Sequence, residues 1–83
     1  MDNSNSIIIT PDGKHGWDIT AYDSDGEPLK HAWSDNGQSA INKAFIIQDF
    51  YRNHAVILTH SFDVDGNLRE DRQVLRTGYL PQP

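Results

Sequence analysis

The sequence predicts a small α+β domain: a three-stranded antiparallel β-meander, one helix packed on the sheet, and a final β-hairpin, in the order βββαββ. Three observations lead to this prediction. Asp-Gly turn signals separate alternating apolar segments at three places, one central stretch repeats apolar residues at helical spacing, and 83 residues allow a single core. We expect one domain over residues 1–83, with residues 1–5 and 78–83 as flexible tails.

The turn signals divide most of the chain into expected strands. They read TPDGK at 10–14, DSDGE at 23–27 and DVDGN at 63–67, so each contains Asp-Gly at the same place. Glycine supplies the positive φ that tight hairpin loops require. The expected strands run over Ser6 to Thr10, His15 to Tyr22, Pro28 to Trp33, His54 to Phe62 and Asn67 to Arg76.

A three-residue loop that ends at the glycine gives one register rule for all three hairpins. It is preferred because a one-residue slip turns a strand inside out, and the two-residue alternative places Trp17 opposite Ser34. The rule predicts these opposite pairs: Ile7 and Trp17, Ile9 and His15, Trp17 and Trp33, Ile19 and His31, Ala21 and Leu29, Phe62 and Leu68, His60 and Glu70, and Val56 and Val74.

The stretch from Ser34 to Asn53 is the only segment long and periodic enough to predict a helix. At 100° per residue, one buried line contains Ala40, Ala44, Ile47 and Tyr51, with Ile41 and Phe50 on its flanks. Phe45 and Ile46 lie off this line, toward expected solvent, so they are either edge packing or a contact surface. The helix should begin beside the turns at Asp12 and Asp65.

Composition limits the classes of partner. The chain carries 12 acids against seven Lys and Arg, a net charge of -5, and the whole surplus lies in residues 1–42. Such a surface repels phosphate backbones, so we expect no direct binding of nucleic acid, and it favours a basic protein partner. We also expect no membrane association, because the sequence contains no apolar span. The alternative is that the acids only keep the protein soluble. With no cysteine, signal peptide or apolar span, we expect a cytoplasmic protein.

No motif in the sequence supports catalysis, a cofactor or a metal. The two Asp-x-Asp-Gly segments fail as calcium loops because their first and twelfth ligand places hold no carboxylate. The four histidines lack metal-ligand spacing. We expect His31 to be a partly buried sheet residue and His60 to form a surface ion pair with Glu70. A metal-assisted enzyme that uses His31 or His60 is the remote alternative.

The first functional hypothesis is therefore a non-enzymatic protein-binding module, including the case of an inhibitor of a basic nucleic-acid-handling protein. Phage-encoded antagonists such as anti-CRISPR proteins and DNA mimics offer an analogy of type, with no shared motif. The alternative is a structural or regulatory subunit that self-associates, as a homodimer, through Phe45, Ile46 and Phe50 or through the second face of the sheet. The predicted partner-binding residues are Asp12, Asp23, Asp25, Glu27, Asp35, Phe45, Ile46, Asp63 and Asp65.

Overall fold

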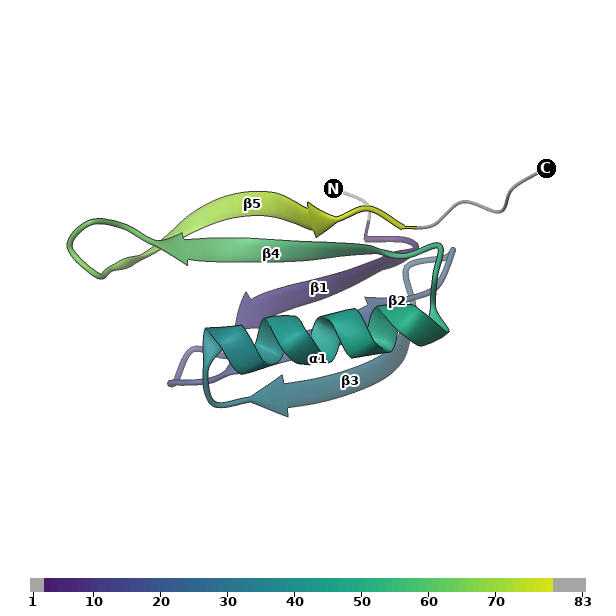
Figure 1. Ribbon diagram of the computed structural model, residues 1–83, viewed down its shortest axis with the longest axis horizontal. Coiled ribbons are helices and arrows are strands. Elements are labelled where there is room, and N and C mark those ends of the chain that lie inside the picture. The colour runs from purple at the N-terminus through teal and green to yellow at the C-terminus, as the bar shows by residue number, and fades with distance from the viewer. Residues whose placement is uncertain (1–2, 79–83) are drawn as a thin grey trace.

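The computed structural model describes residues 3–78 and confirms the α+β fold with the order βββαββ (Figure 1). One mixed five-stranded sheet carries a single helix on one face. Its elements are β1 Ser6–Pro11, β2 Trp17–Tyr22, β3 Pro28–Ser34, α1 Gly37–Phe50, β4 Ala55–Phe62 and β5 Leu68–Arg76.

The strands lie in the order β3-β2-β1-β4-β5, so β1 occupies the centre of the sheet. It pairs antiparallel with β2 and parallel with β4. β3 and β4 point in the same direction, but β2 and β1 lie between them. β5 is an edge strand, and the mixed charges along it discourage pairing with another chain. The β4–β5 hairpin extends beyond the ends of the other strands (Figure 1).

The helix buries the predicted stripe. Asn36 caps its first turn by accepting a hydrogen bond from the Ser39 amide at 2.8 Å. Ala40 and Ala44 are fully buried, and their small side chains let the helix approach the sheet closely. Ile47 is also buried, and Tyr51 packs against the same core.

Each hairpin turn is closed by the side chain of its first aspartate. Oδ1 of Asp23 accepts from the amides of Asp25 and Glu27, and Oδ1 of Asp63 accepts from the amides two and four residues later. Asp12 does the same, with the amides of Lys14 and Gly16 as donors. Asp12 is therefore the counterpart of Asp23 and Asp63, and its following Gly13 takes the positive φ of 83° early in the turn.

This equivalence corrects the predicted register of the first hairpin. The sequence rule aligned Asp12 with the second acid of the other turns, which placed the turn two residues too early. Ile7 faces Ala21 and Ile9 faces Ile19, so the predicted partners Trp17 and His15 are wrong. The displacement is four residues, an even number, so the apolar residues of β1 still face the helix.

The other two hairpins follow the predicted rule only near their turns. Phe62 faces Leu68 and His60 faces Glu70, as predicted, but Ile57 instead of Val56 faces Val74. In the second hairpin the predicted partners are also wrong beyond the turn. Trp17 faces Ser34, Ile19 faces Ala32 and Ala21 faces Lys30. The register shifts at Ala21/Tyr22, Val56/Ile57 and Leu58/His60.

The core lies between α1 and the helix-facing side of the sheet. Its fully buried aliphatic side chains come from Ile7, Ile9, Ile19 and Val56, on β1, β2 and β4. On the opposite face, Ile8 is only 6% exposed although no helix covers it. Its direct neighbours across β2 and β4 are Thr20 and Ile57.

A buried polar network joins the end of the helix to β5. Gln48 is fully buried, and its Nε2 donates to the carbonyl oxygens of His54 at 2.8 Å and Thr77 at 3.2 Å. Its Oε1 accepts from Arg76 Nε at 2.5 Å. His54 is buried as well, and its Nε2 donates to the carbonyl of Tyr22 at 2.7 Å. The network ties the sheet and helix together at this end.

Part of the predicted N-terminal tail is held by the sheet. The amide of Asn5 donates to the carbonyl of Asp23 at 3.0 Å, and the carbonyl of Asn5 accepts from Ala55 at 3.3 Å. Residues 1–2 and 79–83 lie outside the described residues. Within the described part of the chain, no helix is long and apolar enough to cross a membrane.

Candidate functional site

The predicted binding residues fall into three separate regions. Asp23, Asp25 and Glu27 form the turn at one end of the sheet. The turns that contain Asp12, Asp63 and Asp65 lie at the opposite end, together with Asp35 at the start of the helix (Figure 1). Phe45 and Ile46 lie on α1 between the two ends. No single surface therefore contains all nine residues.

The acidic turns contain two kinds of carboxylate. Asp12, Asp23 and Asp63 hold the turn backbone through Oδ1 and are structural residues in the first place. The other kind is exposed and comprises Asp25, Glu27 and Asp65. Within residues 3–78, the side chains of these three acids make no hydrogen bond. These three side chains are the ones free to meet a partner.

Within residues 3–78, no Lys or Arg nitrogen lies within 4.0 Å of a carboxylate. A hydrogen bond joins His31 and Asp18 there, with Nε2 and Oδ1 3.0 Å apart on the face opposite the helix. The carboxylates of residues 3–78 are therefore not held in close ion pairs with Lys or Arg.

Asp12 combines its turn role with a contact to an aromatic residue. Its Oδ2 accepts a hydrogen bond from Trp33 Nε1 at 2.8 Å, while its Oδ1 accepts from two turn amides. The bond from Trp33 and then the backbone bond from Lys14 lower the pKa of the Asp12 carboxyl. The Trp33 indole lies across Gly16, where a Cβ would be 2.4 Å from it.

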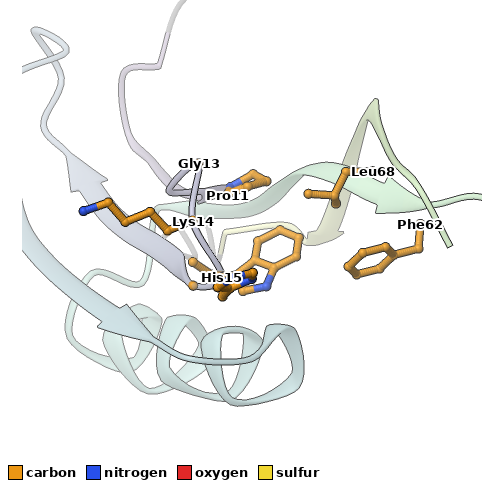
Figure 2. Close-up of a pocket in the computed structure, with 8 residues that line it drawn as sticks. Pro11, Gly13, Lys14, His15, Phe62 and Leu68 are labelled. Atoms are coloured by element: carbon orange, nitrogen blue, oxygen red, sulfur yellow. The ribbon is translucent and has the colours of Figure 1, made fainter.

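A groove of about 330 Å³ opens beside this turn (Figure 2). Trp17, which is 6% exposed, lies beneath it, and Phe62 packs edge-on against the Trp17 indole with their centroids 6.4 Å apart. Phe62 and Leu68 are 62% and 44% exposed, so the groove presents apolar surface to solvent. Its lining residues are Pro11, Gly13, Lys14, His15, Gly16, Trp17, Phe62 and Leu68.

Acid-bearing segments adjoin the residues of the groove. Asp12 lies between Pro11 and Gly13 of the lining, and Asp63 directly follows Phe62. The helix begins at Gly37, where a Cβ would be 3.5 Å from the Trp17 indole, and Asp35 precedes it by two residues. The helix start and the two turns thus share one end of the sheet, as the sequence predicts.

The two apolar helix residues that the sequence could not place differ in their surroundings. Phe45 packs against the core edge, and the Arg76 guanidinium lies 4.1 Å from the centre of its ring. Of the two alternatives, edge packing is therefore correct for Phe45. Ile46 is 60% exposed, and Phe50, one turn later, is 79% exposed. The predicted flank packing of Phe50 is wrong.

The histidines do not have the predicted environments. His31 is exposed and paired with Asp18, and its predicted partner Ile19 faces Ala32. His60 faces Glu70 across the hairpin, but its Nδ1 contacts the Thr59 hydroxyl at 2.7 Å. Among residues 3–78, no three His, Asp or Glu side chains are grouped in a way that could hold a metal ion.

The sequence did not predict the groove, because it placed Trp17 opposite Ile7 and Trp33. The three turns share one feature: Asp12, Asp23 and Asp63 each accept a hydrogen bond from the amide four residues later. Aligning the turns on this first aspartate brings Trp17 next to Pro11. Comparisons of the chain with protein-family models, curated proteins and solved structures find no significant match.

Proposed function

We propose that this protein is a non-enzymatic module that binds a basic protein through the carboxylates of its turns. The observation that carries the proposal is that no Lys or Arg nitrogen lies within 4.0 Å of a carboxylate among residues 3–78. Carboxylates that are not held in close ion pairs can attract a positively charged partner and accelerate encounter. A nucleic-acid-handling enzyme is a fitting partner class, because its phosphate-binding surface is basic, and occupation of that surface would inhibit it.

The turn geometry supports the same proposal. The Asp23 and Asp63 carboxylates fix their turns from inside, so Asp25, Glu27 and Asp65 project from a preorganised backbone. Preorganised charges lose less conformational entropy on binding than charges on flexible loops. Binding should therefore depend on these outward acids, whereas folding depends on the inward ones.

Affinity capture from lysate with charge-neutral variants tests the proposal. One variant carries Asp25→Asn and Glu27→Gln, and a second carries Asp35→Asn and Asp65→Asn, so each end of the sheet is neutralised separately. The matched control carries Asp49→Asn and Glu70→Gln, which are exposed acids outside the turns. We expect capture of a basic protein that weakens with salt and is lost in at least one end variant but not in the control.

Two results would contradict the proposal. Recovery of the protein alone, at low salt, would mean that the acids serve solubility. Equal loss of capture in the control and in both end variants would mean that net charge acts without a defined binding surface.

Self-association is a second candidate function, and the exposure of Ile46 and Phe50 one helical turn apart favours it. Apolar side chains at i and i+4 form a continuous patch on a helix surface. Sedimentation over a hundredfold range of concentration tests this candidate. A monomer throughout the range excludes it, whereas a dimer that dissociates in an Ile46→Ser, Phe50→Ser variant supports it.

A further inference from the structure

The groove between the β1–β2 turn and the β4–β5 hairpin has the composition of a site for one large apolar side chain. Trp17 and Phe62 supply two aromatic faces, and Leu68 adds an aliphatic wall. Its volume of about 330 Å³ is at the small end of the range for ligand pockets. Aromatic and aliphatic anchors that fill such pockets dominate the energetics of protein interfaces.

The charges around the groove indicate the neighbours of that side chain. Asp12 lies between two lining residues, Asp63 directly follows Phe62, and Asp65 lies in the exposed turn just beyond it. Lys14 is the only Lys or Arg among the lining residues, and its ammonium points away from the groove in Figure 2. A segment that enters the groove therefore meets carboxylates at its flanks, which favour Lys or Arg there.

We propose that the groove receives an aromatic or large aliphatic side chain from a basic segment of the partner protein, with Lys or Arg adjacent to that side chain facing the carboxylates of the β4–β5 turn. The proposal rests on the proposed function, and it names the partner feature that the acidic surface recognises. It also assigns the apolar hairpin residues Phe62 and Leu68 a role, because burial by a partner removes their exposed surface from water.

Three short peptides separate the contribution of the apolar side chain from that of charge. The probes are acetyl-Arg-Phe-Arg-amide, acetyl-Arg-Ala-Arg-amide with the same charge, and acetyl-Glu-Phe-Glu-amide with the same anchor. Each is titrated into the ¹⁵N-labelled protein, and the indole N–H of Trp17 reports occupation of the groove. We expect a saturable shift with Arg-Phe-Arg, an at least fivefold larger Kd with Arg-Ala-Arg, and no saturation with Glu-Phe-Glu.

Variants confirm the location. Phe62→Ala should raise the Kd for Arg-Phe-Arg at least fivefold, whereas Phe50→Ala, which removes a more exposed aromatic residue from the helix, should leave it unchanged. An unchanged backbone amide spectrum shows that the Phe62→Ala protein is folded. Phe62→Leu, which keeps an apolar wall, should restore most of the affinity.

The outcomes distinguish the two proposals. Equal affinity for Arg-Phe-Arg and Arg-Ala-Arg, with shifts at the acidic turns and none at Trp17, overturns the groove proposal but leaves the proposed function in place. Shifts with Glu-Phe-Glu as large as those with Arg-Phe-Arg overturn the charge assignment. No saturable shift with any of the three peptides overturns the groove proposal, while salt-sensitive capture of a basic protein still tests the proposed function independently.

Discussion

Replacing Gln48 by methionine should remove much of the stability of this fold. Methionine has a similar length and fills the same space, but it cannot donate to the carbonyls of His54 and Thr77 or accept properly from Arg76. Because Gln48 is fully buried, water cannot replace the lost partners without opening the structure.

The magnitude follows from the three hydrogen bonds. Each bond to a neutral carbonyl contributes about 0.5–1.5 kcal/mol, and a bond that involves a charged group contributes about 1.5–3 kcal/mol. Their sum is about 2.5–6 kcal/mol, and the favourable burial of the thioether reduces it, so we predict a loss of about 2–5 kcal/mol in the free energy of unfolding. A chain of 83 residues has roughly 4–12 kcal/mol in total, at about 0.05–0.15 kcal/mol per residue.

Urea unfolding of the two proteins provides the measurement. Gln38→Met is the matched control, because Gln38 lies on the same helix but is exposed and bonds only to the Asn42 side chain. We expect this control to change stability by less than about 0.5 kcal/mol. A loss below about 1 kcal/mol for Gln48→Met would refute the view that this network holds β5 to the helix.

Three further predictions concern the turn and the core. The pKa of Asp12 is lowered in the folded state, so its contribution to stability is present above the unfolded pKa and is lost as pH falls through the folded pKa. Asp12→Asn should therefore flatten the acidic part of a plot of urea midpoint against pH. Trp33→Phe should raise the Asp12 pKa measured by NMR. Gly16→Ala should displace the Trp33 indole and lower the melting temperature, but cost little in a Trp33→Ala background; an equal cost in both backgrounds would contradict the contact. Ile47→Ala should cost about 2–5 kcal/mol in urea unfolding, whereas Ile46→Ala, at an exposed position, should cost under about 1 kcal/mol, and similar losses would contradict the assigned helix faces.

The sequence predicts the elements well because its turn signals are local. Asp-Gly segments and the helix cap Asn36 locate the ends of the strands and the helix to within a few residues. Apolar alternation also identifies the core side of β1 and β2, since Ile7, Ile9 and Ile19 are fully buried. These features depend on neighbours in the chain and on burial, both of which leave a periodic pattern.

Register and the groove could not be predicted from such patterns. A β-bulge inserts one residue without a strong sequence signal. The second turn has the predicted length, but the register shift at Ala21/Tyr22 places Trp17 opposite Ser34 instead of Trp33. The position of Trp17 beside Phe62 depends on the registers of two hairpins that are distant in the sequence. An error in either predicted register therefore separates Trp17 from Phe62, and the groove is not predicted.

Buried polar residues are the other feature that the sequence concealed. Gln48 occupies a position beside the apolar stripe, and its amide is satisfied by the His54 carbonyl together with Arg76 of β5 and the Thr77 carbonyl that follows it. His54 is likewise buried against the Tyr22 carbonyl, although the sequence marks no histidine for the core. Such burial is decided by long-range partners, which hydrophobic periodicity does not report.

The salt dependence of partner capture tests the central claim most directly. Capture is measured at low and high salt with the native protein, with the two end variants and with the Asp49→Asn, Glu70→Gln control. The account predicts that a basic protein is retained at low salt by the native protein and the control, released at high salt, and lost in at least one of the two end variants. Retention that is insensitive to salt and equal in every variant would contradict it.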